Sequence, residues 1–158
     1  MHSFFTDYLC NLEEIHDDIR KTITGLPLEA LDWTPSPEIN SLAVLVTHLT
    51  GAEQYWIGDV VAGEPSGRDR EAEFRVSGLR KDDLLAKLGE ADRVARQALE
   101  EMSIQALEEK RISPRNGREV TVGWAVVHAL KHTALHAGHL QITRQLWEGQ
   151  ASGEGVNN

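Results

Sequence analysis

Apolar side chains recur along most of the chain at alternating spacings of three and four residues, which is the period of an amphipathic α-helix. The clearest stripe consists of Phe5, Tyr8, Leu12, Ile15, Ile19 and Ile23. Gly25 and Pro27 follow it and favour the end of a helix. Comparable stripes predict three further helices, over residues 41–62, 80–102 and 122–147.

Capping residues delimit two of these helices. Asn40 or Ser41 can cap the second helix and Thr121 the fourth, because their side chains accept hydrogen bonds from free backbone N–H groups. Gly63 and Gly149 are expected to end the same two helices.

The connections differ in kind. Residues 26–40 contain three prolines and are expected to be irregular, and residues 63–78 read as a long polar crossover between helices two and three. Asn116-Gly117 is typical of a type I′ turn, so residues 111–122 form either a short hairpin or only a turn.

Four amphipathic helices with one long crossover and no strong strand predict an all-α four-helix bundle. A less regular helical array is the alternative. We expect one domain over residues 1–150 and a frayed C-terminal tail over residues 151–158.

Composition narrows the class of protein. The 158 residues are 41% hydrophobic and 26% charged, as in ordinary globular domains. No run approaches the roughly 18 apolar residues of a membrane span, and the N-terminus lacks the pattern of a signal peptide, so we expect a cytoplasmic protein. Cys10 is the only cysteine, which excludes an internal disulfide and a cysteine-based zinc site.

The net charge of −9 argues against nucleic acid as a partner, because that affinity depends on Lys and Arg neutralising phosphates. The basic residues are also scattered among acids. A small-molecule substrate is therefore the expected partner.

Four of the seven histidines lie in the single stretch HALKHTALHAGH. At about 100° per residue, His128, His132, His136 and His139 fall within about 80° of one another on the helix surface. His132 and His136 are four residues apart, so their imidazoles project over the same spot and can share one metal ion. His48 lies on or beside the apolar face of the second helix and could supply a third ligand. The alternative is three separate histidines, each satisfied by its own polar partners.

Two segments carry a family resemblance. SLAVLVTHLTGAEQYW and VGWAVVHALKHTALHAGHLQITRQLW, with the preceding LDWTP, resemble the second and fourth helices of the DinB-like (YfiT-like) superfamily. These proteins are four-helix bundles that hold a metal with one histidine of helix two and a His-x-x-x-His of helix four. The resemblance implies that His48, His132 and His136 are metal ligands, and it also implies a homodimer.

A related branch contains the mycothiol-dependent maleylpyruvate isomerases, which have glutamate at the position of His132. The Ala137-Gly138-His139 continuation is similar to that branch, whereas His132 itself is similar to the YfiT-like branch.

Other polar and aromatic residues are weaker candidates. His139 and His128 could support the metal ligands or be partly exposed, and Glu53 is either an acceptor near the site or, more simply, a surface charge. Trp56 and Trp124 either line a pocket or only pack. We expect His16 to be a hydrogen-bonded core histidine.

Three imidazoles without a fourth protein ligand leave an open metal position, as in catalytic sites. Zinc is the expected ion and nickel is possible. The metal could activate water, giving a hydrolase, or a thiol such as mycothiol or bacillithiol, giving a thiol transferase, which the resemblance favours. A non-catalytic metal-binding stress-response module is the third hypothesis. Residues 63–78 and 103–121 are expected to form the walls of the substrate pocket.

Overall fold

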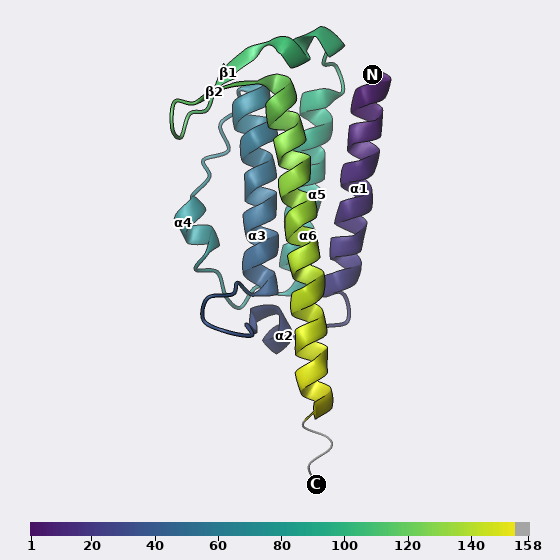
Figure 1. The fold of residues 1–158 in the computed structure, drawn as a ribbon, viewed down its shortest axis with the longest axis vertical. Helices are drawn as coiled ribbons and strands as arrows, with labels where there is room; N and C mark the ends of the chain where they lie inside the picture. The colour runs from purple at the N-terminus through teal and green to yellow at the C-terminus, as the bar shows by residue number, and fades with distance from the viewer. Residues whose placement is uncertain (154–158) are drawn as a thin grey trace.

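Four long helical rods lie side by side in the computed structural model, which describes residues 1–153 (Figure 1). They are α1 (Ser3–Ile23), α3 (Leu42–Glu53) with its π-helical continuation η1 (Gln54–Ala62), α5 (Lys81–Leu99), and α6 (Val122–Gly153). The prediction of an all-α four-helix bundle is therefore confirmed. In the described residues no helix is both long and apolar enough to cross a membrane.

The interior is divided into two apolar clusters with a polar layer between them. One cluster gathers around Phe5, Tyr8, Leu12, Ile57, Leu99 and Ala125. The other gathers around Ile19, Leu42, Leu49, Leu84, Leu88 and Leu140. Between these stretches of the four rods lie His16, Glu53, Asp92 and Thr133, which bond to one another in the middle of the bundle. The bundle thus buries most of its apolar surface at its two ends.

The predicted caps and stops largely hold. Ser41 accepts a hydrogen bond from the N–H of Val44 at 3.3 Å, and Thr121 accepts one from the N–H of Trp124 at 3.1 Å. Gly63 takes the left-handed conformation, with φ of 73°, and ends η1 as expected.

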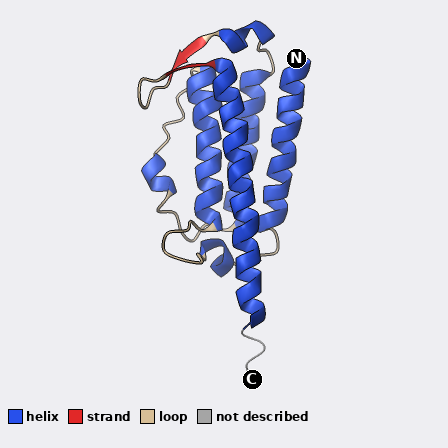
Figure 2. Cartoon of the chain, in the orientation of Figure 1, coloured by secondary structure: helices blue, strands red, loops and turns tan. Residues whose placement is uncertain are grey.

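The segments between the rods contain more helix than predicted. The proline-containing connection holds α2 (Leu28–Asp32), the crossover over residues 63–78 holds α4 (Arg70–Glu73), and the 3-10 helix η2 (Ile104–Glu108) follows α5 (Figure 2). A single turn leaves too few residues for an apolar stripe to repeat, so periodicity could not find these elements.

Residues 111–122 do form a hairpin, with β1 (Lys110–Ile112) antiparallel to β2 (Glu119–Thr121). The type I′ turn was wrong. That turn needs positive φ at both central residues, whereas Gly117 has φ of 69° and no described non-glycine residue has a positive φ. A longer loop results, closed by a 2.9 Å bond from the N–H of Gly117 to the carbonyl of Ser113.

The C-terminal boundary of α6 also differs from expectation. The helix passes Gly149 and runs to Gly153, extending beyond the body of the bundle in Figure 1. Gly149 keeps a negative φ, and a glycine in a helix interior costs only about 1 kcal/mol, so it does not end the helix. The predicted frayed tail is thus helical over residues 151–153, and its remainder, residues 154–158, lies outside the described residues.

Candidate metal centre

The structure brings His48, His132 and His136 together between α3 and α6. Each offers one ring nitrogen, and these three atoms lie within 4.8 Å of one another. The ring centroids are 5.0 Å apart for His48 and His132, 5.1 Å for His48 and His136, and 4.5 Å for His132 and His136. His48 is buried and the other two are half-buried. Two distant segments therefore converge on one cluster, as the helical spacing predicted.

The electrostatics of the cluster suit metal ligands. Burial, together with the positive charges that neighbouring histidines would carry, lowers the pKa of His132 to about 3 and that of His136 to about 4. Both imidazoles are then neutral near pH 7, with a lone pair free for a cation. Nδ1 of His132 is buried and has no hydrogen-bond partner among the described residues. The donor set therefore fits a divalent metal that prefers nitrogen.

A carboxylate from the crossover fixes the orientation of His48. Glu73, in α4, accepts a hydrogen bond from Nδ1 of His48 at 2.8 Å. Arg68 holds the same carboxylate with both ends of its guanidinium, at 2.5 and 2.8 Å. Burial alone would raise the pKa of Glu73, but the hydrogen bonds from Arg68 and His48 outweigh it and lower that pKa. The ionised Glu73 can only accept, so the proton stays on Nδ1 and Nε2 of His48 is left for the metal.

Gly51 makes room for this carboxylate. A Cβ atom at position 51 would overlap Oε1 of Glu73. Sequence reasoning missed both Glu73 and Arg68, because an Arg and a Glu in a polar crossover look like any solvated charges. Gly51, inside a helix where glycine is unfavourable, was the one local signal that something packs closely there.

The weaker candidates divide. His139 is exposed, and its Nδ1 lies 3.3 Å from Nδ1 of His136, so it contacts the cluster. His128 instead stacks on Trp124, with ring centroids 4.5 Å apart and planes at 14°. Trp56 packs edge-on against Trp124 at 5.3 Å and against His128 at 4.9 Å. These three rings form an aromatic group next to His132 along α6.

Glu53 is not the surface charge that was expected. Its carboxyl group is buried, and Oε1 accepts hydrogen bonds from Nε2 of His16 at 3.0 Å and from Oγ1 of Thr133 at 2.6 Å. Nδ1 of His16 donates to Asp92 at 2.6 Å, so His16 is the satisfied core histidine that was predicted. The carboxylate that bonds to His48 is Glu73, while Glu53 serves the polar layer of the core.

Comparison with known proteins follows from this geometry. A sequence profile of the mycothiol S-transferase family matches residues 9–149, which include every histidine of the cluster. The chain belongs to this family. No curated protein matches the chain.

Solved structures share the fold of this family member at low sequence identity. A conserved protein from Enterococcus faecalis is 17% identical, with a TM-score of 0.77 over 91% of this chain and 96% of that one. YfiT from Bacillus subtilis is 15% identical, with a TM-score of 0.72 over 94% and 90%. A DinB-like protein from Bacillus subtilis, YjoA, is 15% identical, with a TM-score of 0.65 over 91% of each chain. The DinB-like, YfiT-like assignment made from two segments is thereby confirmed across the fold.

In this mycothiol S-transferase family member, we predict that Glu73→Gln weakens metal binding by about 10- to 100-fold, as removal of such supporting carboxylates does elsewhere. Glutamine keeps the shape but loses the charge that holds His48 in the right tautomer. Competition with a chelating dye measures the affinity. Glu71→Gln is the matched control, because Glu71 lies in the same short helix and is exposed. Equal affinities for Glu73→Gln and the unaltered protein would contradict the role of Glu73.

Proposed function

We propose that this protein is a metal-dependent enzyme that transfers a low-molecular-weight thiol, of the mycothiol or bacillithiol type, to a small electrophilic substrate. The observation that carries the proposal is the cluster of three histidines, two of them with pKa values far below neutrality, in a chain of the mycothiol S-transferase family. Zinc is the proposed ion and nickel the alternative.

The surroundings of the cluster support catalysis over simple metal storage. A pocket of about 370 Å³ opens beside His136 and His139, and apolar side chains line much of it, including Ile39, Leu45, Ile142 and Leu146. A concave, mostly apolar space with a few polar groups is typical of small-molecule sites. The pocket gives an electrophile a place next to the open side of the histidines.

Each residue has a defined task in this proposal. A divalent metal with an open position lowers the pKa of a bound thiol, which supplies the reactive nucleophile near pH 7. His132 and His136 contribute neutral nitrogen donors one helical turn apart. His48 contributes the third, held in place by Glu73 and Arg68. His139, in contact with His136, is placed to hold or pass a proton at the edge of the pocket.

Hydrolysis is the second candidate. YfiT, which shares the fold, is described as a probable metal-dependent hydrolase. The same three histidines could serve a metal that activates water. A metal-binding module without catalysis and a homodimeric assembly stay predictions from the sequence.

The test separates these functions. The metal-loaded protein is incubated with 1-chloro-2,4-dinitrobenzene and a panel of small thiols. Transfer forms a carbon–sulfur bond, releases chloride and gives the thiol proton to the buffer. We expect conjugate formation above the uncatalysed rate, lost in His48→Ala and kept in Glu71→Gln. Thiol-independent cleavage of esters or amides would favour the hydrolase, and silence in both assays would contradict an enzymatic role.

A further inference from the structure

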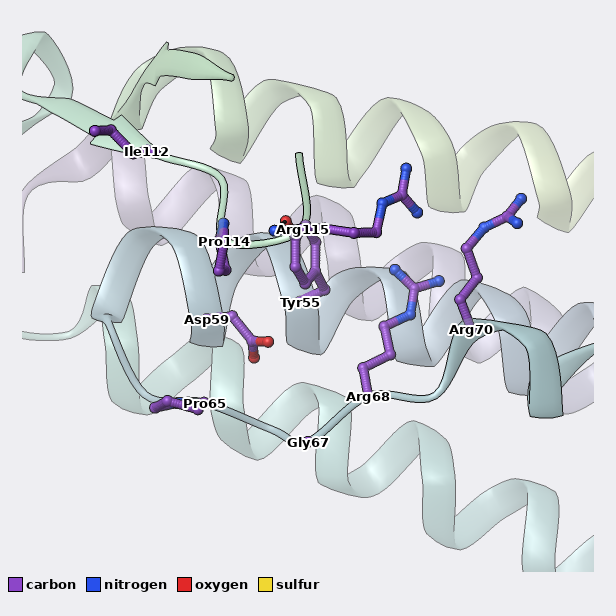
Figure 3. Close-up of a pocket in the computed structure, with 9 residues that line it drawn as sticks. All are labelled: Tyr55, Asp59, Pro65, Gly67, Arg68, Arg70, Ile112, Pro114 and Arg115. Carbon is purple, nitrogen blue, oxygen red and sulfur yellow. Dashed lines mark hydrogen bonds between the residues drawn. The ribbon is translucent and has the colours of Figure 1, made fainter. Parts of the chain in front are cut away.

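A second pocket, of about 450 Å³, opens between η1, the crossover and the hairpin loop (Figure 3). In Figure 3 the guanidinium groups of Arg68, Arg70 and Arg115 extend into one end of it, while Asp59 lies at the other end. The protein as a whole carries a net charge of −9, so three arginines around one hollow run against its average. The pocket is therefore polarised, with a cationic end.

The arginines of the cationic end are not equally engaged. Arg68 is held by the buried carboxylate of Glu73. Arg70 has one long contact, 3.4 Å to the exposed Glu71. The Arg115 side chain makes no hydrogen bond or ion pair within residues 1–153, although its backbone N–H is anchored to the hydroxyl of Tyr55 at 3.2 Å. Arg115 is thus a cation on a fixed loop, free to bind something else.

The nearby acids do not neutralise this end. Asp59 accepts a hydrogen bond from the N–H of Ser66, and Asp69 caps α4 by accepting one from the N–H of Ala72. Both carboxylates are therefore engaged with backbone groups of the crossover.

The pocket shares residues with the metal centre. Arg68 reaches His48 through Glu73. Arg70 lies over the ring of Phe74, 4.9 Å from its centroid, and the other neighbour of that ring is His48, at 4.7 Å. One molecule can therefore place a reacting group at the histidines and an anionic group at the arginines.

We propose that Arg70 and Arg115 form a subsite for a carboxylate of the thiol or of its electrophilic acceptor, resting on the proposed function. Two guanidinium groups present paired N–H donors in a planar fork, the geometry that carboxylates accept. Arg68 adds positive potential but stays with Glu73. The enzyme then selects anionic over neutral partners of the same size.

Two matched pairs of probes test the subsite with the cobalt-loaded protein. For the thiol, glutathione is compared with its diethyl ester, and the change in cobalt absorbance on titration gives each dissociation constant. For the acceptor, 4-chloro-3,5-dinitrobenzoate is compared with 1-chloro-2,4-dinitrobenzene in KM, with whichever thiol perturbs the cobalt absorbance.

In one of these pairs we expect the anion to bind about tenfold or more tightly than its neutral partner, the effect of one charge-assisted hydrogen bond or more. The Arg70→Ala, Arg115→Ala double variant should lose that preference. Arg75→Ala, which removes an exposed arginine of the same crossover outside the pocket, should keep it. Added salt should weaken the preference because the arginines face solvent.

The outcomes distinguish the two levels of the argument. Thiols that bind to the cobalt protein without any preference for the anion, in both pairs, overturn the subsite and leave the proposed transfer intact. A preference that survives in the double variant also overturns it. If no thiol changes the cobalt absorbance, the thiol-transfer function fails, and this inference with it.

Discussion

Replacement of His132 by alanine is expected to abolish stoichiometric metal binding while leaving the bundle folded. His132 lies closest to both other members of the cluster, with ring centroids at 5.0 Å from His48 and 4.5 Å from His136. Two remaining imidazoles would hold a divalent ion far more weakly than three, because structural and catalytic zinc sites use at least three protein ligands. Elemental analysis of the purified variant after dialysis measures the loss.

The matched control for this variant is His128→Ala, one helical turn earlier on α6. His128 stacks on Trp124, and its ring centroid is 6.1 Å from that of His132, so metal content should stay close to one ion per chain. Circular dichroism should show the same helix content for both variants. A full complement of metal in His132→Ala would disprove the assignment of the site.

Substitution of His16 by leucine is expected to lower the free energy of unfolding by about 3–5 kcal/mol, the usual cost of breaking a buried ion pair from one side. His16 has no exposed surface, and its two ring nitrogens bond to Glu53 and Asp92. Leucine would leave the buried Glu53 carboxylate with only Thr133 as a partner. Urea denaturation measures the change, and Glu14→Ala, at an exposed position of α1, should stay within about 0.5 kcal/mol.

The pH dependence gives an independent check on His16. Burial lowers its pKa, but the hydrogen bonds and charges of Asp92 and Glu53 outweigh burial and raise the pKa to about 9. Because the folded value lies above the unfolded value of about 6.5, the contribution to stability is complete below pH 6.5 and is lost as the pH rises through about 9. The leucine variant should lack this loss. A parallel decline in both proteins between pH 7 and 10 would contradict the charged His16.

Local chemistry was enough to predict the rods of the bundle and the metal cluster. Apolar stripes locate α1, α3 and α6, because a helix that packs on one side must repeat its apolar residues every three to four positions. The same period places His132 and His136 above one another on α6. His48 needed more than periodicity, since only the family resemblance indicated that helix two faces helix four at that level.

The polar layer could not be predicted from one strand of sequence. Glu53 follows a run of apolar residues and looked like a charge turned to solvent, yet it is 2% exposed. What makes its burial favourable is His16 on α1 and Thr133 on α6, at separations of 37 and 80 residues. A buried charge is tolerated only with such partners, and no pattern within α3 names them.

The sequence by itself therefore determined the helical class, the three histidines and the family to which they belong, because each depends on spacing within one helix or on a recognisable segment. Only the tertiary structure decided which carboxylate serves the metal centre and where the cationic pocket lies. Glu73, Arg70 and Arg115 sit on short, irregular segments whose positions depend on packing against α3 and η1. Contacts of this kind join residues far apart in the chain, and they leave no period for sequence reasoning to detect.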